Sequence, residues 1–353
     1  MAKKRKPEQL IIGGQEILPG ERRVIDIPVA PMYTHDDLSI SVQVIRSKHP
    51  GPTLFVCAAI HGDEINGVEI IRRLLKNPLM DRLKGTLIAI PIVNIYGFIH
   101  HTRYLPDGRD LNRSFPGSGR GSLTGRLAQT FMNEIVANST HGIDLHTGAR
   151  HRSNFPQIRA NLDDPETLGL TNAFGAPLAI NSAIRDGSLR QCASDIGVPV
   201  ILYESCEALR FDETYIRAGE SGIVNVMRHL GMLRKRRGQT KPPTISHETG
   251  WVRAPTSGVL RVLVPLGAEV AQGQTIGIIA DPLGSSEVDV LADGGGIIIG
   301  RTNLPLVYEG DALFHIASIS PKANWEVEEF HVDHEPTEQE LDPEDPSTLP
   351  IAT

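Results

Sequence analysis

The chain has 353 residues, a formal net charge of −7 and few aromatic residues, which make up 5% of the sequence. This length suffices for one large domain and a smaller one, and the acidic balance argues against general nucleic-acid binding, which requires a basic face. Three scattered cysteines (Cys57, Cys192 and Cys206) are too few for a disulfide framework and predict small buried side chains in a reducing compartment.

The first residues, MAKKRK, are basic, but no apolar stretch of signal-peptide length follows, because Gly13, Gly14 and Gln15 interrupt it. The longest apolar stretch of the chain, LIAIPIVNIYGF, is too short to span a bilayer. We therefore expect a soluble, cytoplasmic protein that engages neither membranes nor nucleic acid. Residues 1–24 are expected to form a flexible N-terminal segment.

Residues 25–240 have the pattern of an α/β domain. RRVIDIPVA and DLSISVQVIRS alternate like half-exposed strands, whereas GPTLFVCAAI and GTLIAIPIVN are typical of buried strands on either side of a helix in INGVEIIRRLLKN. This order predicts a parallel strand pair with a helical crossover. After a loop rich in glycine and arginine (96–121), helices alternate with buried strands in HGIDLHTG and VPVILYES. The order predicts a mostly parallel sheet flanked by helices.

Residues 250–320 change to an all-β pattern. The segments 254–280 and 291–317 align with each other, so that SGVL falls on GGGI and Gly273 on Gly310. Two similar halves predict a small pseudo-twofold sandwich or barrel. It resembles a biotinyl/lipoyl carrier domain, but no lysine lies between Lys241 and Lys322, so we expect a structural module. The acidic, proline-rich residues 325–353 are expected to be disordered.

Polar residues follow several predicted strands, where open parallel sheets bind ligands. His61 and Glu64 are three residues apart in HGDE, and His146 ends the strand HGIDLHTG. Each could be an ordinary polar residue at a strand end, but together they supply three ligands and leave one position open, which is typical of a catalytic zinc site. Gly62 is expected to permit a sharp turn. Asp144 lies on the same strand face as His146 and is placed to hold its tautomer.

Two further segments supply charged groups. Glu204 in VILYES follows a buried strand, where a carboxylate is costly unless it pairs, binds a metal or acts as a base; Glu207 is its local competitor. Arginine can hold a carboxylate through two hydrogen bonds or stabilise an oxyanion. The loop HTRYLPDGRDLNRSFPG brings three arginines close to an asparagine: Arg103, Arg109, Arg113 and Asn112.

In this order, HGDE, TRY followed by DLNR, DLHTG and a strand-end Glu resemble the succinylglutamate desuccinylase/aspartoacylase family. The resemblance covers residues 25–320 and implies the zinc-carboxypeptidase-like fold, an α/β fold with a mostly parallel or mixed sheet, followed by a small barrel-sandwich β domain. It also implies one Zn²⁺ per chain. The implied zinc ligands are His61, Glu64 and His146.

The resemblance further implies Glu204 as general base and acid and Arg103 as the group that polarises the scissile carbonyl. Asn112 and Arg113 are implied to bind a substrate carboxylate. The spacing between TRY and DLNR differs from the aspartoacylase pattern, which leaves Arg109 as a rival of Arg103.

We therefore expect a zinc-dependent hydrolase that cleaves the amide or ester bond of a small N-acyl amino acid or related carboxylate-bearing substrate, using metal-activated water. The small β domain is expected to restrict the mouth of the site to small substrates. Two alternatives stay open: a zinc carboxypeptidase acting on peptides, and a non-catalytic zinc- or ligand-binding protein. The sequence selects neither the acyl group nor the amine, and the resemblance is compatible with a homo-oligomer.

Overall fold

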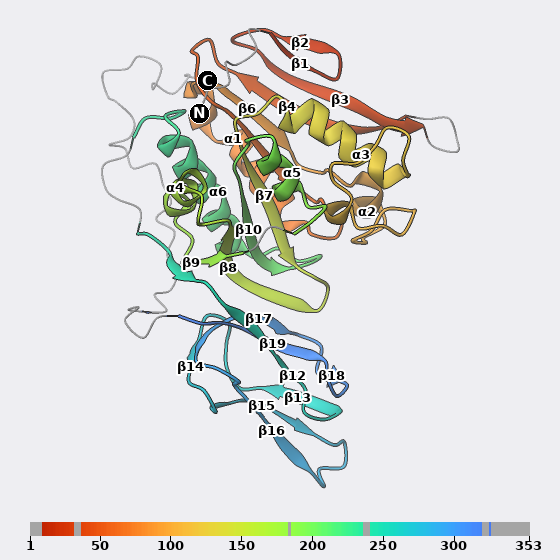
Figure 1. The fold of residues 1–353 in the computed structure, drawn as a ribbon, viewed down its shortest axis with the longest axis vertical. Helices are drawn as coiled ribbons and strands as arrows, with labels where there is room; N and C mark the ends of the chain where they lie inside the picture. Colours follow the sequence, from red (N-terminus) through yellow and green to blue (C-terminus); the bar gives the residue numbers. More distant parts are fainter. Residues whose placement is uncertain (1–8, 32–36, 183–184, 236–240, 320–324, 326–353) are drawn as a thin grey trace, which may run out of the picture.

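The computed structural model describes residues 9–31, 37–182, 185–235, 241–319 and 325 (Figure 1). The predictions made for residues 1–8 and for the acidic tail after Trp325 lie outside the described residues. Within the described part of the chain, no helix combines the length and the apolar character needed to cross a membrane.

Residues 10–17 form a hairpin rather than part of the expected flexible segment. β1 (Leu10–Ile12) and β2 (Gln15–Ile17) pair antiparallel, and the side chains of Ile12 and Ile17 are fully buried. Gly13 and Gly14 both have positive φ, which is the backbone that a two-residue hairpin loop of type I′ requires. The glycines that interrupt the apolar run therefore form the turn.

The main sheet is mixed, which confirms the predicted α/β class of the larger domain. Its strand order is β12-β19-β17-β8-β10-β7-β5-β6-β4-β3. The neighbours β10, β7, β5 and β6 run parallel, whereas β3 with β4, β4 with β6, and β8 with β10 pair antiparallel. These strands and the branch strand β9 have the following bounds: β3 (Arg22–Pro31), β4 (Asp37–Arg46), β5 (Thr53–Ala58), β6 (Thr86–Ile90), β7 (His141–Gly148), β8 (Arg152–Ala160), β9 (Leu178–Asn181) and β10 (Val200–Glu207).

Helices cover both faces of this sheet (Figure 1). Along β5, Leu54 and Val56 pack into the core cluster that contains α1 (Asn66–Lys76), α4 (Pro165–Phe174) and α6 (Glu213–His229). Phe55 and Cys57 alternate with them and pack toward the opposite cluster. The helices and turns on that side and in the connecting loops are α2 (Ile95–Ile99), α3 (Leu123–Phe131), the π-helix η3 (Met132–Val136), α5 (Leu189–Asp195), and the 3₁₀ turns η1 (Pro78–Arg82) and η2 (Leu111–Arg113). The predicted crossover between β5 and β6 is α1.

From Thr244 to Ala317 every described element is a strand. A four-stranded sheet of order β16-β15-β13-β18 lies at the lower end of the molecule (Figure 1). A separate apolar core that includes Leu260, Ile279 and Phe314 fills this region. The strands are β11 (Thr244–Ser246), β12 (Thr249–Arg253), β13 (Gly258–Val262), β14 (Glu269–Val270), β15 (Thr275–Ala280), β16 (Glu287–Leu291), β17 (Gly296–Thr302), β18 (Leu306–Val307) and β19 (Ala312–Ala317).

The main sheet continues into this β region. β17 pairs antiparallel with β8, with Gly300 opposite Asn154 and Thr302 opposite Arg152, and β11 pairs with β9. The two regions therefore share backbone hydrogen bonds as well as a connecting segment. The domain boundary expected between residues 240 and 250 stays a prediction.

Candidate metal centre and active site

The HGDE motif forms the loop between β5 and α1. The amide of Glu64 donates to the carbonyl of His61 at 3.0 Å, so both side chains leave one tight turn. A Cβ on Gly62 would lie 2.0 Å from the carbonyl carbon of Gly97 in α2, while Gly62 is not among the residues with positive φ. Glycine is required here for close backbone contact, which corrects the expectation that it permits a sharp turn.

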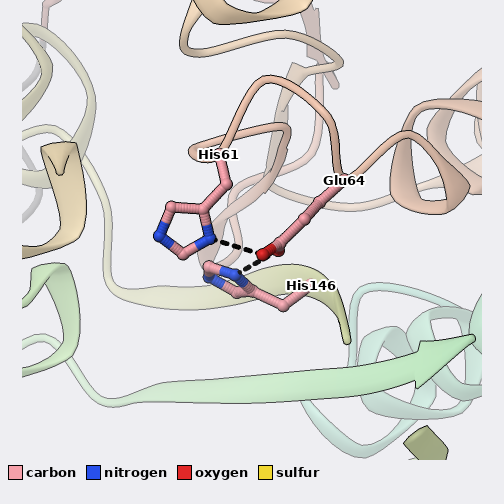
Figure 2. A group of neighbouring side chains, drawn as sticks. All are labelled: His61, Glu64 and His146. Carbon is pink, nitrogen blue, oxygen red and sulfur yellow. Dashed lines mark hydrogen bonds and ion pairs between the residues drawn. The ribbon is translucent and has the colours of Figure 1, made fainter. Parts of the chain in front are cut away.

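His61, Glu64 and His146 converge on one point (Figure 2). Nδ1 of His61 lies 2.6 Å from Oε1 of Glu64, and Nδ1 of His146 lies 2.7 Å from Oε2 of the same carboxylate. One potential ligand atom from each residue lies within 4.8 Å of the others, and all three residues are buried. The structure thus brings together the three residues that the sequence implied as metal ligands.

The far side of each imidazole contacts a second carboxylate. Nε2 of His146 lies 2.8 Å from Oδ2 of Asp144, which confirms the predicted contact. Nε2 of His61 lies 3.1 Å from Oδ1 of Asp110, a partner that sequence analysis missed. The thiol of Cys57 donates to Oδ1 of Asp144 at 3.4 Å. Because both Nε2 atoms have carboxylate partners, the two Nδ1 atoms are the ones that could bind a metal.

Asp144→Asn should weaken zinc affinity by about 10- to 100-fold, because a neutral amide holds and polarises the His146 ring less well than a carboxylate does. Zinc affinity would be measured by competition with a chelator. The matched control is Asp212→Asn, which changes an aspartate whose side chain caps α6 by accepting from the Tyr215 amide. Equal zinc affinity in the Asp144 and Asp212 variants would contradict the role of Asp144.

The positive charge in the cluster comes from protons on the two imidazoles, which a bound cation would replace. Burial raises the pKa of the Glu64 carboxyl, but the imidazoles of His61 and His146 lower it further, so that the pKa lies well below its usual range. Burial lowers the pKa of His146, yet Asp144 and Glu64 raise it well above the usual value. Protonated imidazoles thus balance the buried carboxylates, and a divalent metal competes with those protons for the same atoms.

Arg103 borders this cluster, whereas Arg109 does not face it. The guanidinium of Arg103 donates to Oδ2 of Asp110 at 2.8 Å and to Oε1 of Glu64 at 3.2 Å. Asn94 donates to the carbonyl of Arg103 at 3.2 Å and fixes its backbone. The Arg109 side chain is 64% exposed and lies 3.9 Å from Asp107. Position therefore favours Arg103 over its rival.

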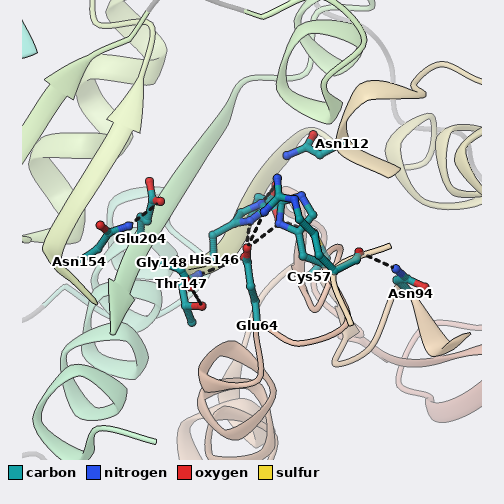
Figure 3. Close-up of polar contacts among 12 residues, drawn as sticks. Cys57, Glu64, Asn94, Asn112, His146, Thr147, Gly148, Asn154 and Glu204 are labelled. Carbon is teal, nitrogen blue, oxygen red and sulfur yellow. Dashed lines mark hydrogen bonds and ion pairs between the residues drawn. The ribbon is translucent and has the colours of Figure 1, made fainter. Parts of the chain in front are cut away.

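Asn112 and Arg113 lie in η2, which follows Asp110. Oδ1 of the buried Asn112 accepts a hydrogen bond from the amide of Leu189 at 3.0 Å, so η2 is tied to the start of α5. Arg113 donates to the carbonyl of Asn112. In the view of Figure 3, Asn112 lies above Glu64 and His146, on the side away from Thr147. Asn112 and Arg113 thus follow closely after Asp110, which contacts His61, and their role in binding a substrate stays a prediction.

Glu204 lies beside His146 on the neighbouring strand. β10 and β7 are parallel with Glu204 opposite His146, so both side chains leave the same face of the sheet. Asn154 donates to Oε1 of Glu204 at 2.7 Å (Figure 3). Nε of Arg159 lies 2.5 Å from Oε2. Sequence analysis missed Asn154 and Arg159, because it assigned no strand to β8.

Two other charged residues near Glu204 are Glu207 and Arg190, and Glu207 has different hydrogen-bond partners from Glu204. Oε1 of Glu207 accepts from the amide of His151 at 2.9 Å, and Oε2 accepts from Asn303 at 2.8 Å, so this carboxylate binds the loop after β7 and the β region. Arg190 of α5 was also missed by sequence analysis. Burial and the charge of Arg159 lower its pKa to about 10, which indicates that cationic side chains gather near Glu204.

The catalytic-domain model of the Succinylglutamate desuccinylase/Aspartoacylase family matches residues 50–230. The chain belongs to this family. It is 29% identical over 294 residues to N-alpha-acetyl-L-2,4-diaminobutyric acid deacetylase from Halomonas elongata, covering 79% of this chain and 86% of the relative. These findings confirm the predicted family and support hydrolytic deacylation as its chemistry.

Solved structures support the same assignment. The succinylglutamate desuccinylase/aspartoacylase from Rhodobacter sphaeroides superimposes with a TM-score of 0.75 and 26% identity, over 85% of this chain and 96% of that chain. The product-bound ectoine utilization protein EutE (DoeB) from Ruegeria pomeroyi gives a TM-score of 0.76 at 22% identity, over 86% and 98% of the two chains. At this identity, the similarity to the Ruegeria pomeroyi protein shows a shared fold.

Proposed function

We propose that this family member is a zinc-dependent deacylase that hydrolyses the amide bond of a small N-acyl amino acid. The observation that carries the proposal is the buried cluster of His61, Glu64 and His146 with Glu204 on the adjacent strand position. Two imidazole nitrogens and a carboxylate form a donor set of catalytic zinc. Zinc held by these residues would polarise the substrate carbonyl and lower the pKa of a water molecule to about 7.

The chain's own residues supply the proton transfers. Glu204 accepts the proton of the attacking water and later gives it to the leaving nitrogen. Asn154 and Arg159 hold the two oxygens of Glu204, so the carboxylate keeps one orientation while it does so. Arg103, whose side chain is 26% exposed, donates to the oxygen of the attacked carbonyl as negative charge develops there.

The substrate proposal takes its starting point from the Halomonas elongata relative, whose name specifies an acetyl group on a diaminobutyric acid. We propose an N-acetyl or similarly small N-acyl amino acid with a free carboxylate. Asn112 and Arg113 would bind that carboxylate, because arginine matches carboxylate geometry with two donors.

Arg113→Ala should lower kcat/KM at least tenfold for N-acyl amino acids, and far less for the same compounds with the carboxylate converted to an amide. The measurement is hydrolysis of matched acid and amide pairs by the zinc-loaded enzyme. Arg109→Ala is the control, because it removes an exposed arginine of the same loop. An equal loss on both members of each pair would count against carboxylate binding by Arg113.

The proposed function is tested by incubating the zinc-loaded protein with a panel of N-acetyl and N-succinyl amino acids and with short peptides that have free carboxyl termini. We expect hydrolysis of at least one N-acyl amino acid and a higher kcat/KM for it than for any peptide. Preferential cleavage of peptides would favour the carboxypeptidase alternative. Zinc binding without hydrolysis of either class would favour the non-catalytic alternative.

A further inference from the structure

Asn154 reaches Glu204 through an irregularity in strand pairing. β8 and β10 place Gln157 opposite Glu204 but Asn154 opposite Cys206, so three residues of β8 span two residues of β10. Regular alternation would direct Asn154 and Gln157 to opposite faces of the sheet, and a bulge of this kind re-aims a side chain. Cys206, at the bulge, has a φ of 70°. The distortion therefore aligns the Asn154 amide with the carboxylate of Glu204.

Gly300 of the β region provides the space for this amide. It lies opposite Asn154 in the pairing of β17 with β8. A Cβ on Gly300 would lie 2.8 Å from Oδ1 of Asn154 and 3.3 Å from Cβ of His315. The distance to Oδ1 of Asn154 is too short for a Cβ contact, and this oxygen lies at the end of a side chain that can move. The absence of a side chain at Gly300 thus lets Asn154 keep the orientation in which its Nδ2 donates to Glu204.

The residue that follows β17 also contacts β8 and β10. Asn303 donates to Oγ of Ser153 at 2.5 Å and to Oε2 of Glu207 at 2.8 Å. Ser153 precedes Asn154 on β8, and Glu207 follows Glu204 on β10. The β region thus contacts both strands next to the residues that form the Asn154–Glu204 hydrogen bond.

We propose that Gly300 and Asn154 are positioning residues that orient the Glu204 carboxylate, which makes β17 of the C-terminal β region part of the catalytic apparatus. The inference rests on the proposed role of Glu204 as the base. With Oε1 held by Asn154 and Oε2 by Arg159, the carboxylate has little rotational freedom. Removing the Asn154 contact leaves the proton acceptor less well aligned with the attacking water.

Gly300→Ala tests this proposal directly, because the added methyl group displaces the Asn154 amide. We expect kcat to fall about 10- to 100-fold, the effect of one hydrogen bond to a charged group, with KM nearly unchanged. A fall in kcat at constant KM is the result expected when substrate still binds but the proton acceptor is misaligned. Gly250→Ala is the matched control: Gly250 lies in β12, and a Cβ there meets nothing within 4 Å.

A double-mutant cycle shows whether the two residues act through one contact. Asn154→Ala should reproduce the loss of kcat at nearly unchanged KM, and adding Gly300→Ala to it should have no further effect. Independent losses that multiply, or a changed melting temperature with unchanged kcat, would overturn the proposal. If Gly300→Ala does not fold, an unchanged kcat in Asn154→Ala overturns it equally.

A readout without substrate separates this inference from the proposed function. The side-chain amide signal of Asn154 can be assigned in the NMR spectrum of isotope-labelled protein by its disappearance in Asn154→Ala. It should shift in Gly300→Ala and in Glu204→Gln and stay in place in Gly250→Ala. An inactive wild-type protein would refute the deacylase proposal while this signal still reports on the contact. An active enzyme with an unmoved signal in Gly300→Ala would refute the inference alone.

Discussion

Glu204→Gln should lower kcat by about 10²- to 10⁴-fold, the range typical for loss of a general acid–base group. The amide of glutamine keeps the shape of the side chain and still offers an oxygen to Asn154, but it does not accept the proton of the attacking water. Zinc content should be unchanged, because the three implied ligands are separate residues. The measurements are the steady-state rate and the metal content of the same preparation.

Glu207→Gln is the matched control for this variant. Glu207 lies on the same strand, and its carboxylate is engaged by His151 and Asn303, so its replacement should leave most of the activity. Near-normal turnover in Glu204→Gln together with a large loss in Glu207→Gln would move the base to Glu207.

His146→Ala should reduce bound zinc from about one ion per chain to a trace, because two remaining protein ligands do not complete a catalytic zinc site. It also leaves the buried carboxylates of Glu64 and Asp144 without their shared imidazole. Breaking a buried charged pair costs about 3–5 kcal/mol of unfolding free energy. Metal analysis and denaturant unfolding of the metal-free proteins would measure the two effects.

His141→Ala provides the comparison for His146→Ala. His141 is also buried and begins the same strand, but it pairs with Thr140 and Glu166 at the opposite end of β7. Its replacement should leave the zinc content unchanged. Equal zinc in wild type and His146→Ala would refute the assigned ligand set. No zinc in the wild type after incubation with the metal would refute the proposal that the protein is zinc-dependent.

The sequence predicted that His61, Glu64 and His146 lie together, because these residues follow or end strands with strong local signals. β5 and the first half of β10 are apolar runs, and β7 alternates Ile143 and Leu145 with polar residues. Neighbouring parallel strands bring His61, His146 and Glu204 to the carboxyl ends of these strands. Each strand could be recognised without knowledge of its partners. The order of the motifs then identified the family.

The surroundings of Glu204 could not be predicted in the same way. RSNFPQIRA, which forms β8, contains a proline and several polar residues, so its own propensity for a strand is low. Its strand conformation depends on pairing with β10 and with β17, which is remote in the sequence. The bulge that turns Asn154 toward Glu204 is likewise a property of paired strands. Asp110 was missed because its contact with His61 joins two loops.

The pairing of β17 with β8 also determines where the chain can be divided. A fragment that ended near residue 240 would retain the family catalytic region at 50–230, but it would lose the strand that covers the backbone of Arg152, Ser153 and Asn154. Exposed strand edges of this kind promote association between molecules. The catalytic region is therefore expected to be a poor candidate for expression by itself, and fusions or truncations should preserve the chain through β19.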